Sequence, residues 1–426
     1  MNPPPPNRIP AQEHGIDQSL LDINSLEVVS RLKEAGFDAF LVGGCVRDLL
    51  LGVTPKDFDV ATSATPEEVK SLFRRARLVG RRFRIAHVRF GRDIIEVSTF
   101  RKSDPDTAEF NQHGMIVSDN EFGTLVEDAY RRDFTINALY YDPVTGDVLD
   151  YVGALRDMAD RRIDCIGDAH VRLAEDPVRA LRALRFKAKL NFSIADSISD
   201  MLEETAERLS AIPSARLFEE FNKLFMLGYA HPAWRAISTS PIHRVLFPCT
   251  PADSQITDLA MRNTDERLAS GKPATPGFLI AVLLWEDYSA RLRELSTHQP
   301  RLVAAHAAAD QTLAAQSAII AIPRRYSTFA QEVWQLQPRI EERAPRGIMR
   351  LLGHKRFRAA YDLLGLRAHV DTALKPVFDW WTQFQEEPEQ RDNLLASVPK
   401  LATAKKPRRR RRNRNKPAQP VSDPTP

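Results

Sequence analysis

The most constraining feature of this chain is the stretch FLVGGCVRDLLLGVTPKDFDVAT, residues 40–62. The apolar run before Gly43 is typical of a strand, the two glycines mark its end, and a short helix is expected after them. A second strand is expected over DFDVAT, residues 57–62. Asp57 and Asp59 lie two residues apart on it, so both carboxylates are expected to leave the same face of the strand.

The neighbouring carboxylates of Asp57 and Asp59 predict a metal site. Two carboxylates side by side repel each other unless a cation neutralises them. Oxygen ligands of this kind suit Mg²⁺, which is usually bound by one or two carboxylates together with water and substrate phosphates. Two such ions, about 3.5–4 Å apart, activate a hydroxyl and hold the leaving oxygens of an in-line displacement. The alternative is an exposed strand or turn whose aspartates bind nothing.

The glycine turn before the second strand has the features of an anion site. Gly43 and Gly44 let backbone N–H groups approach a phosphate closely, and the helix that follows turns its positive end toward the same place. Arg47 can add a bidentate contact to a phosphate. An ordinary strand-to-helix turn is the alternative. The combination of an anion-binding turn and a metal-binding strand favours nucleotidyl transfer, in which a triphosphate and metal ions meet.

A third acidic side chain would complete such a site, and two candidates stand out. Strand alternation places Glu96 opposite Ile95 and Val97, so it can point toward the same site. Asp133 follows two arginines in RRDFTINALYYD. Its alternative role is to cap a short helix that begins at Phe134.

The first part of the chain, up to residue 165, has the pattern of a mixed α/β domain around a small sheet. Apolar spacing predicts a helix over 25–36, and another over 65–76 with Thr65 as its N-cap. Two strands, 85–91 and 94–101, are expected to form a hairpin.

Beyond residue 174 the periodicity is mainly helical, and it is clearest over residues 214–225 and 357–370. The alternative role for Arg179, Arg182 and Arg185, in the predicted helix over 174–190, is the solvated face of that helix.

Charge is distributed unevenly along the chain. Residues 405–416 carry nine positive charges, although the net charge of the whole chain is only +4. A flexible cationic tail is expected to bind RNA phosphates with strong salt dependence. A solvated disordered end and a docking site for acidic partner proteins are the alternatives. Three scattered cysteines and the lack of a long apolar run favour a cytoplasmic protein without a membrane span.

Four motifs in register resemble those of the class II nucleotidyltransferases, the tRNA CCA-adding enzymes and bacterial poly(A) polymerases. They are LVGGCVRDLLLG, DFDVAT, RRDFTINALYYD and EDPVRALRALRF, within residues 40–225. The resemblance implies an α+β, polymerase-β-like head with a small mixed sheet, followed by an all-α neck, body and tail. It also implies Mg²⁺-dependent, template-independent addition of nucleotides to RNA 3′ ends.

The resemblance assigns roles by motif position. Asp57 and Asp59 would hold the two catalytic metals, and Asp133, ranked above Glu96, would be the further catalytic carboxylate. The nucleotide-binding residues would be Gly43, Gly44 and Arg47 for the triphosphate, Arg132 and Asn137 for sugar and phosphates, and Asp176 and Arg179 for the base. A carboxylate and a guanidinium offer a base edge both an acceptor and donors.

Poly(A) polymerases are favoured over CCA-adding enzymes by the remainder of the chain. Residues 77–91, 355–368 and 380–385 resemble stretches of bacterial poly(A) polymerases, and CCA-adding enzymes generally lack an arginine tail. ATP is the expected substrate, although EDPVR itself does not distinguish ATP from CTP. CCA addition is the alternative activity, and an RNA-binding protein on an inactive scaffold is the non-enzymatic alternative.

These observations predict a monomer with five regions that acts on RNA 3′ ends. The regions are a disordered lead (1–22), a catalytic head (23–165), a base-recognising and RNA-binding neck (166–240), an RNA-binding helical body and tail (241–385), and a disordered basic end that binds RNA (386–426).

Overall fold

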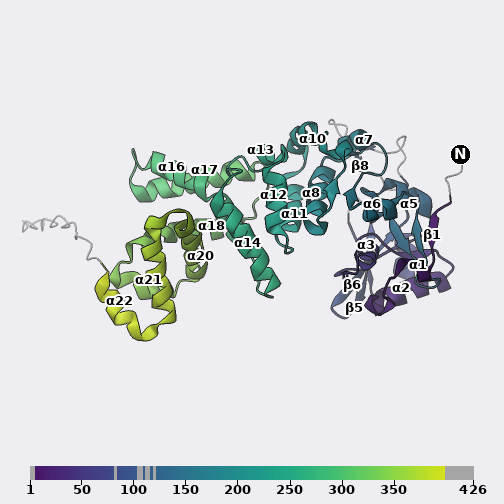
Figure 1. Cartoon of the computed structure of the whole chain (residues 1–426), viewed down its shortest axis with the longest axis horizontal. Coiled ribbons are helices and arrows are strands. Elements are labelled where there is room, and N and C mark those ends of the chain that lie inside the picture. Colours follow the sequence, from purple (N-terminus) through teal and green to yellow (C-terminus); the bar gives the residue numbers. More distant parts are fainter. Residues whose placement is uncertain (1–4, 81–83, 103–108, 111–115, 119–120, 399–426) are drawn as a thin grey trace, which may run out of the picture.

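The computed structural model describes residues 5–80, 84–102, 109–110, 116–118 and 121–398. A mixed α/β head lies at one end of an elongated molecule, and helices make up the rest (Figure 1). This is the predicted architecture of an α+β head followed by an all-α region. Among the described helices, none is long and apolar enough to cross a membrane.

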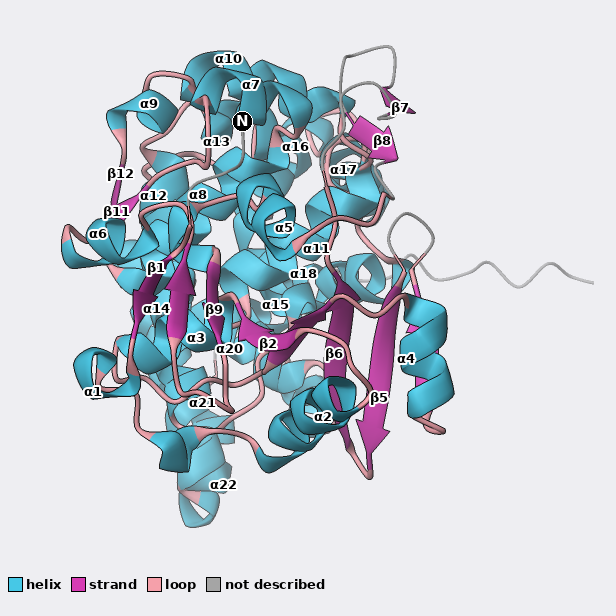
Figure 2. Ribbon diagram, turned by 90° about the vertical axis from the view of Figure 1, so that its right-hand side faces the viewer, coloured by secondary structure: helices cyan, strands magenta, loops and turns pink. Residues whose placement is uncertain are grey.

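The head contains an eight-stranded sheet, seen from the head end of the molecule in Figure 2. Its strand order is β1-β10-β9-β2-β3-β6-β5-β4, and only the β3–β6 pair is parallel. The strands are β1 (Asn7–Ile9), β2 (Ala39–Val42), β3 (Asp59–Thr62), β4 (Ala76–Val79), β5 (Ile85–Phe90), β6 (Asp93–Thr99), β9 (Leu139–Tyr141) and β10 (Val148–Asp150). Two-stranded sheets are formed by β7 (Glu109–Phe110) with β8 (Ile116–Ser118) and by β11 (Arg162–Ile163) with β12 (Ser193–Ile194).

Helices cover both faces of the central part of this sheet. On one face α2 (Ile23–Glu34) and α4 (Pro66–Leu72) pack against the strands, and α3 (Gly44–Leu50) follows β2. On the other face Ala129 of α5 (Leu125–Arg131) packs against a small core around Phe40 and Tyr140. The predicted cap of α4 is confirmed, because Thr65 and Glu68 form a capping box. The predicted β5–β6 hairpin is also confirmed.

The expectation of a disordered lead over 1–22 is wrong for the part that the structure describes. β1 pairs with β10 as an edge strand, and the short helix α1 (Ala11–His14) follows it. Arg8 of β1 forms an ion pair with Asp147 across the β1–β10 pair. An edge strand such as β1 can pair through its backbone without an apolar pattern, so the proline-rich sequence did not predict it.

The helical region begins after the head and continues to residue 398. The head also includes α6 (Ala154–Ala159). The helices of the helical region are α7 (Ala169–Glu175), α8 (Val178–Leu190), α9 (Asp196–Ser199), α10 (Leu202–Arg208), α11 (Ser214–Phe225), α12 (Ala230–Ser238), α13 (Ile242–Leu246), α14 (Gln255–Ala269), α15 (Pro276–Leu283), α16 (Trp285–Leu295), α17 (Arg301–Ser317), α18 (Arg324–Glu342), α19 (Ile348–Leu352), α20 (Phe357–Val370), α21 (Lys375–Glu386) and α22 (Arg391–Ser397). The helices predicted over 214–225 and 357–370 are confirmed as α11 and α20.

The predicted start of the disordered end, at residue 386, is too early. α22 lies beyond it, and the Trp380 indole of α21 donates a hydrogen bond to the carbonyl oxygen of Leu394. Val398 is also buried. Aromatic packing therefore extends the folded region past the point where glutamate and proline become frequent. The predicted cationic run at 405–416 lies outside the described residues.

Candidate active site

The turn between β2 and α3 places Gly43 next to Arg132 and Asn137, two other residues of the predicted nucleotide site. Gly43 has φ 78° and ψ −124°, a backbone conformation that favours glycine. A Cβ atom at this position would lie 3.5 Å from Nη1 of Arg132 and 3.5 Å from the carbonyl oxygen of Asn137. α3 begins at Gly44, so the glycine turn lies at the start of the helix, as the sequence predicts.

Asp57 and Asp59 flank a buried phenylalanine at the edge of this turn. Phe58 is in the core, whereas both aspartates are exposed, and this alternation directs both carboxylates to the same side. β3 begins only at Asp59, which pairs with Val42 of β2 and with Glu96 of β6. Although part of Asp59 is accessible at the surface, its carboxyl group is surrounded by protein; this burial and the neighbouring charge of Glu96 raise its pKa to about 6, against the opposing effect of Arg132.

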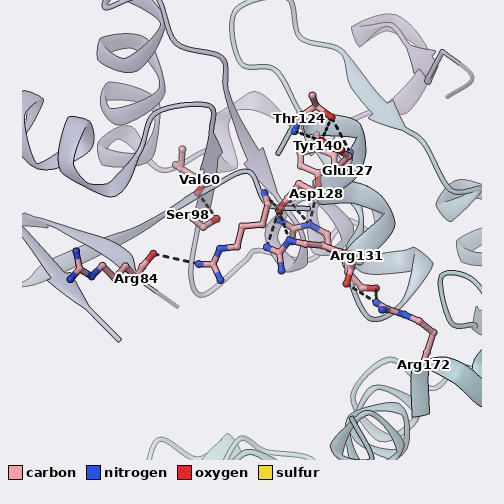
Figure 3. Close-up of polar contacts among 11 residues, drawn as sticks. Val60, Arg84, Ser98, Thr124, Glu127, Asp128, Arg131, Tyr140 and Arg172 are labelled. Atoms are coloured by element: carbon pink, nitrogen blue, oxygen red, sulfur yellow. Dashed lines mark hydrogen bonds and ion pairs between the residues drawn. The ribbon is translucent and has the colours of Figure 1, made fainter. Parts of the chain in front are cut away.

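Arg132 is held beside these carboxylates by α5 and β9. Its Nε and Nη2 atoms donate to Asp128 at 3.2 and 2.9 Å, and Nε also donates to the Tyr140 hydroxyl at 3.0 Å. Although burial opposes it, the charges of Arg132 and Arg131 lower the pKa of Asp128 to about 2. Figure 3 shows this cluster around Asp128. Arg172 of α7 completes the cluster, since its Nη2 donates to the backbone carbonyls of Arg131 and Arg132 at 2.6 and 2.8 Å.

Arg47 is buried beside the glycine turn, with its Nη2 atom 3.6 Å from the position that a Cβ atom of Gly44 would take. It is only 2% exposed, its Nε and Nη2 atoms donate to Asp48 at 2.9 and 2.6 Å, and its Nη1 donates to Oδ1 of Asn137 at 2.5 Å. Lys189 of α8 forms an ion pair with the same Asp48 at 2.8 Å. The guanidinium also lies over the Phe186 ring. The predicted roles of Arg47 and Asn137 in nucleotide contact stay predictions, while Arg47 and its partner Asp48 connect α3 to α8.

Asp133 is engaged in a second junction between the head and α8. Arg182 of α8 donates to its Oδ2 at 2.7 Å, and its Oδ1 accepts from Asn137 and from the backbone of Phe134. Although burial opposes it, the Arg182 charge holds the pKa of Asp133 well below its usual range. Arg182 thus does not lie on a solvated helix face. Glu96 lies beside Asp59 and approaches His87 at 3.4 Å, and the ranking of Asp133 above Glu96 stays a prediction.

The predicted base-binding residues line a cleft of about 460 Å³ between the head and α7, α8 and α11. It is lined by Ile85, Ser98, Arg101, Arg131, Arg132, Asp133, Asp176, Arg179, Arg182, Arg216, Glu219, Glu220 and Lys223. Asp176 forms an ion pair with Arg216 of α11 at 2.6 Å, and Arg179 one with Glu175 at 3.0 Å. The structure therefore brings Asp176, Arg179 and Arg132 into one cleft. Arg216 was missed because no local pattern links it to Asp176.

The acidic pair fits a metal ion that is completed by substrate. No group of three or more His, Cys, Asp or Glu side chains in the described part of the chain is arranged to hold a metal by itself. Burial is the main cause of the raised pKa of Asp59, and the negative charges of Glu96 and Asp57 add to it while the positive charge of Arg132 opposes it. Two neighbouring carboxylates suit Mg²⁺, which takes its other ligands from phosphates and water.

We expect Asp59→Asn to stabilise the metal-free protein above pH 6. The folded pKa of Asp59 is about 6 and its ordinary value is 3.8, so the folded state gains stability by holding this proton. That gain is fully present below pH 3.8 and is lost as the pH rises through about 6. Melting temperatures are measured in EDTA at a series of pH values. The melting temperature of the variant minus that of wild type should increase from pH 4 to 7. A constant difference across that range would contradict the assignment.

Comparisons with known proteins bear on the whole chain. Three family models match it: the Poly A polymerase head domain over 39–164, the probable RNA and SrmB-binding site of polymerase A over 191–253, and the Polymerase A arginine-rich C-terminus over 295–416. Poly(A) polymerase I of Escherichia coli O6:H1 is 42% identical over 430 residues, 95% of this chain and 92% of that protein. Poly(A) polymerase I of Haemophilus influenzae is 38% identical over 95% of both chains.

CCA-adding enzymes are similar to this chain in sequence over about half of its length, and in fold over most of it. The CCA-adding enzyme of Leuconostoc citreum is 40% identical over 203 residues, 48% of this chain and 49% of that protein. The crystal structure of the Bacillus stearothermophilus CCA-adding enzyme in complex with CTP superposes with a TM-score of 0.57 at 25% identity. The superposition covers 88% of this chain and 82% of that one.

The fold, the glycine turn and these matches together show that the chain is a nucleotidyltransferase with a catalytic head and a helical region. CCA-adding enzymes share sequence with about half of it, whereas poly(A) polymerase I sequences match nearly all of it. The chain belongs to the poly(A) polymerase family. The predicted resemblance is thereby confirmed.

Proposed function

We propose that this chain adds AMP from ATP to RNA 3′ ends without a template. The observation that carries the proposal is the placement of Asp57 and Asp59 beside the Gly43 turn and the Arg132 guanidinium. Carboxylates for metal and a cation for phosphate are the two requirements of nucleotidyl transfer. Similarity to poly(A) polymerase I along nearly the whole chain favours adenylate addition over CCA addition.

The residues of the head would orient the triphosphate for attack by the RNA 3′ hydroxyl. Asp57 and Asp59 would hold Mg²⁺, which activates the hydroxyl and stabilises charge on the leaving pyrophosphate. The backbone at Gly43 and Gly44 and the Nη1 group of Arg132 would bind phosphate oxygens on one side of the carboxylates. The Asp128 carboxylate fixes the Arg132 guanidinium, so little reorganisation is needed when a nucleotide binds.

The cleft between head and helices would receive the base. Asp176 offers acceptors and Arg179 offers donors to the edge of adenine, as the motif resemblance predicts. Arg216 would keep the Asp176 carboxylate in a fixed direction through their 2.6 Å ion pair. A fixed carboxylate discriminates better among bases than a mobile one, because a mismatched base then leaves a buried polar group unpaired.

Labelled nucleotides and two RNAs test the activity. Purified full-length chain is incubated with Mg²⁺ and either ATP or CTP, together with a tRNA lacking its CCA end or an arbitrary transcript. Long A-tracts on both RNAs from ATP alone are expected. Incorporation that stops after C-C-A on the tRNA alone would show that the chain is a CCA-adding enzyme, and no incorporation would favour an inactive scaffold.

We expect Glu96→Gln and Asp133→Asn to have different effects, the first on the Mg²⁺ requirement and the second on stability. Glu96 lies beside Asp59, so its neutralisation should raise the Mg²⁺ concentration needed for half-maximal activity while the melting temperature holds. Asp133 balances Arg182 in a buried pair, so Asp133→Asn should lower the melting temperature and leave the Mg²⁺ requirement unchanged. The opposite pattern would restore Asp133 as the third metal-site carboxylate.

The proposal includes the metal, the substrates and the cellular location of the protein. Mg²⁺ and ATP are the metal and nucleotide, RNA 3′ ends are the acceptors, and the protein works as a cytoplasmic monomer. The cationic run at 405–416 would bind RNA phosphates without sequence preference, or acidic partner proteins. The five predicted regions, with the folded part extended to residue 398 and to β1, describe how these tasks are divided.

A further inference from the structure

One exposed face of the head sheet continues directly from the carboxylates. Cross-strand register places Asp59 of β3 opposite Glu96 of β6, Glu96 opposite His87 of β5, and His87 opposite Arg77 of β4. These four side chains form a single row across four strands on the same face of the sheet. His87 and Glu96 approach each other at 3.4 Å, Nε2 to Oε1. The row therefore runs without interruption from the acidic site to the edge of the sheet.

The rows on either side of this one combine positive charge with exposed apolar area. Arg89 pairs with Ile94 across β5 and β6, and both side chains are exposed. Ile94 is 49% exposed and Val79 of β4 is 39% exposed. The opposite face of the same strands is core, with Ala86 and other small apolar residues buried against the helices. Arginines between exposed aliphatic side chains suit a flexible polyanion with apolar rings, as in single-stranded RNA.

The chemistry of the site favours this side for the acceptor. An in-line displacement needs the attacking hydroxyl and the leaving pyrophosphate on opposite sides of the reacting phosphorus. The Gly43 turn follows β2, which lies on one side of β3, whereas β6, β5 and β4 lie on the other side. If the triphosphate binds at the Gly43 turn, the RNA is therefore expected to bind on the side of β6, β5 and β4.

The same face leads into the cleft that is proposed for the base. Ile85 of β5 and Ser98 of β6 line that cleft together with Asp176 and Arg179. In Figure 1, β5 and β6 lie on the side of the head that faces the helical region. An RNA end on this face would meet the incoming nucleotide at the carboxylates, while its upstream part could continue toward the helices.

We propose that the face formed by Arg77, Val79, His87, Arg89 and Ile94 binds the last nucleotides of the acceptor RNA. The two arginines contact phosphates, His87 contacts the RNA beside Glu96, and the aliphatic side chains cover riboses or bases. The site thus takes single-stranded RNA at its 3′ end and no nucleoside triphosphate. This inference rests on the proposed nucleotidyl transfer to RNA.

Charge reversal on the face tests the inference. In full-length chain carrying Arg77→Glu and Arg89→Glu, the KM for a short RNA acceptor should rise about tenfold or more, while the KM for ATP stays within about twofold. The salt dependence of kcat/KM for RNA should weaken by roughly 0.7 in log–log slope for each phosphate that the face no longer neutralises. The matched control reverses Arg74 and Arg156, two exposed head arginines outside the face. An unchanged KM for RNA, or an equal rise in the control, would overturn the inference.

A second measurement does not depend on how the variants fold. Wild-type chain is irradiated with an acceptor RNA carrying 4-thiouridine near its 3′ end, and the cross-linked peptides are identified by mass spectrometry. Cross-links within residues 84–96 support the RNA face, and cross-links confined to the helical region overturn it. Wild-type chain that extends no RNA refutes the proposed function instead, so the two failures are distinguishable.

Discussion

Asp59→Ala is expected to abolish nucleotide addition while leaving the fold intact. The substitution removes one of the two carboxylates proposed to hold Mg²⁺, a contribution of several kcal/mol, so kcat should fall about a thousandfold or more. The fold does not depend on this carboxylate, because burial and the Glu96 charge make its ionised form unfavourable. Single-turnover extension of a labelled RNA, read beside a melting curve, measures both effects.

Asp57→Ala should behave in the same way, since both carboxylates lie on the same side of the chain. The matched control is Asp93→Ala, which removes an exposed aspartate at the start of β6, away from the acidic row. Extension at a normal rate by either variant of the pair would refute the metal-site assignment. A loss of activity accompanied by unfolding would show that the carboxylates are structural.

Arg47→Ala is expected to unfold the head–neck junction. The guanidinium is 2% exposed and joins Asp48 to Asn137, so its removal leaves buried polar groups without their partner. Breaking such a buried network costs about 3–5 kcal/mol. For a unit of this size that corresponds to roughly 10 °C in melting temperature. Calorimetry of the variant and wild type under identical buffer conditions measures the difference.

Two further variants separate a structural role for Arg47 from direct binding of a triphosphate. Arg47→Lys keeps the charge but cannot bond to both Asp48 and Asn137, so it should also lower the melting temperature. Arg156→Ala, which removes an exposed arginine from a surface ion pair with Asp160, should change it by less than about 1 kcal/mol in stability. A stable Arg47→Ala protein with a raised KM for ATP would instead favour direct phosphate binding.

Local patterns predicted the parts of the head that depend on nearby residues. The strand ending at Gly43 and the cap at Thr65 follow from glycine conformation and hydrogen bonding within a few positions. The shared direction of Asp57 and Asp59 follows from strand alternation. The helices over 214–225 and 357–370 were predicted to the residue, because long amphipathic patterns are rarely ambiguous.

The partners of the arginines could not be predicted from local patterns. Arg47 donates to its neighbour Asp48 and to Asn137, which lies 90 positions further along the chain, and no sequence spacing records the second contact. The same is true of Arg182, which reaches an aspartate 49 positions away. The place of Glu96 beside Asp59 required the parallel register of β3 and β6. Alternation alone indicated its face but not its neighbour.

A crystal of the full chain grown with Mn²⁺ and a non-hydrolysable ATP analogue would show directly whether Asp57 and Asp59 hold the metal. Manganese is located by its anomalous scattering and takes the same oxygen ligands as magnesium. We expect manganese bound by Asp57 and Asp59, with the triphosphate between the Gly43 turn and Arg132. Manganese bound elsewhere, or a triphosphate held by residues remote from this turn, would contradict this expectation.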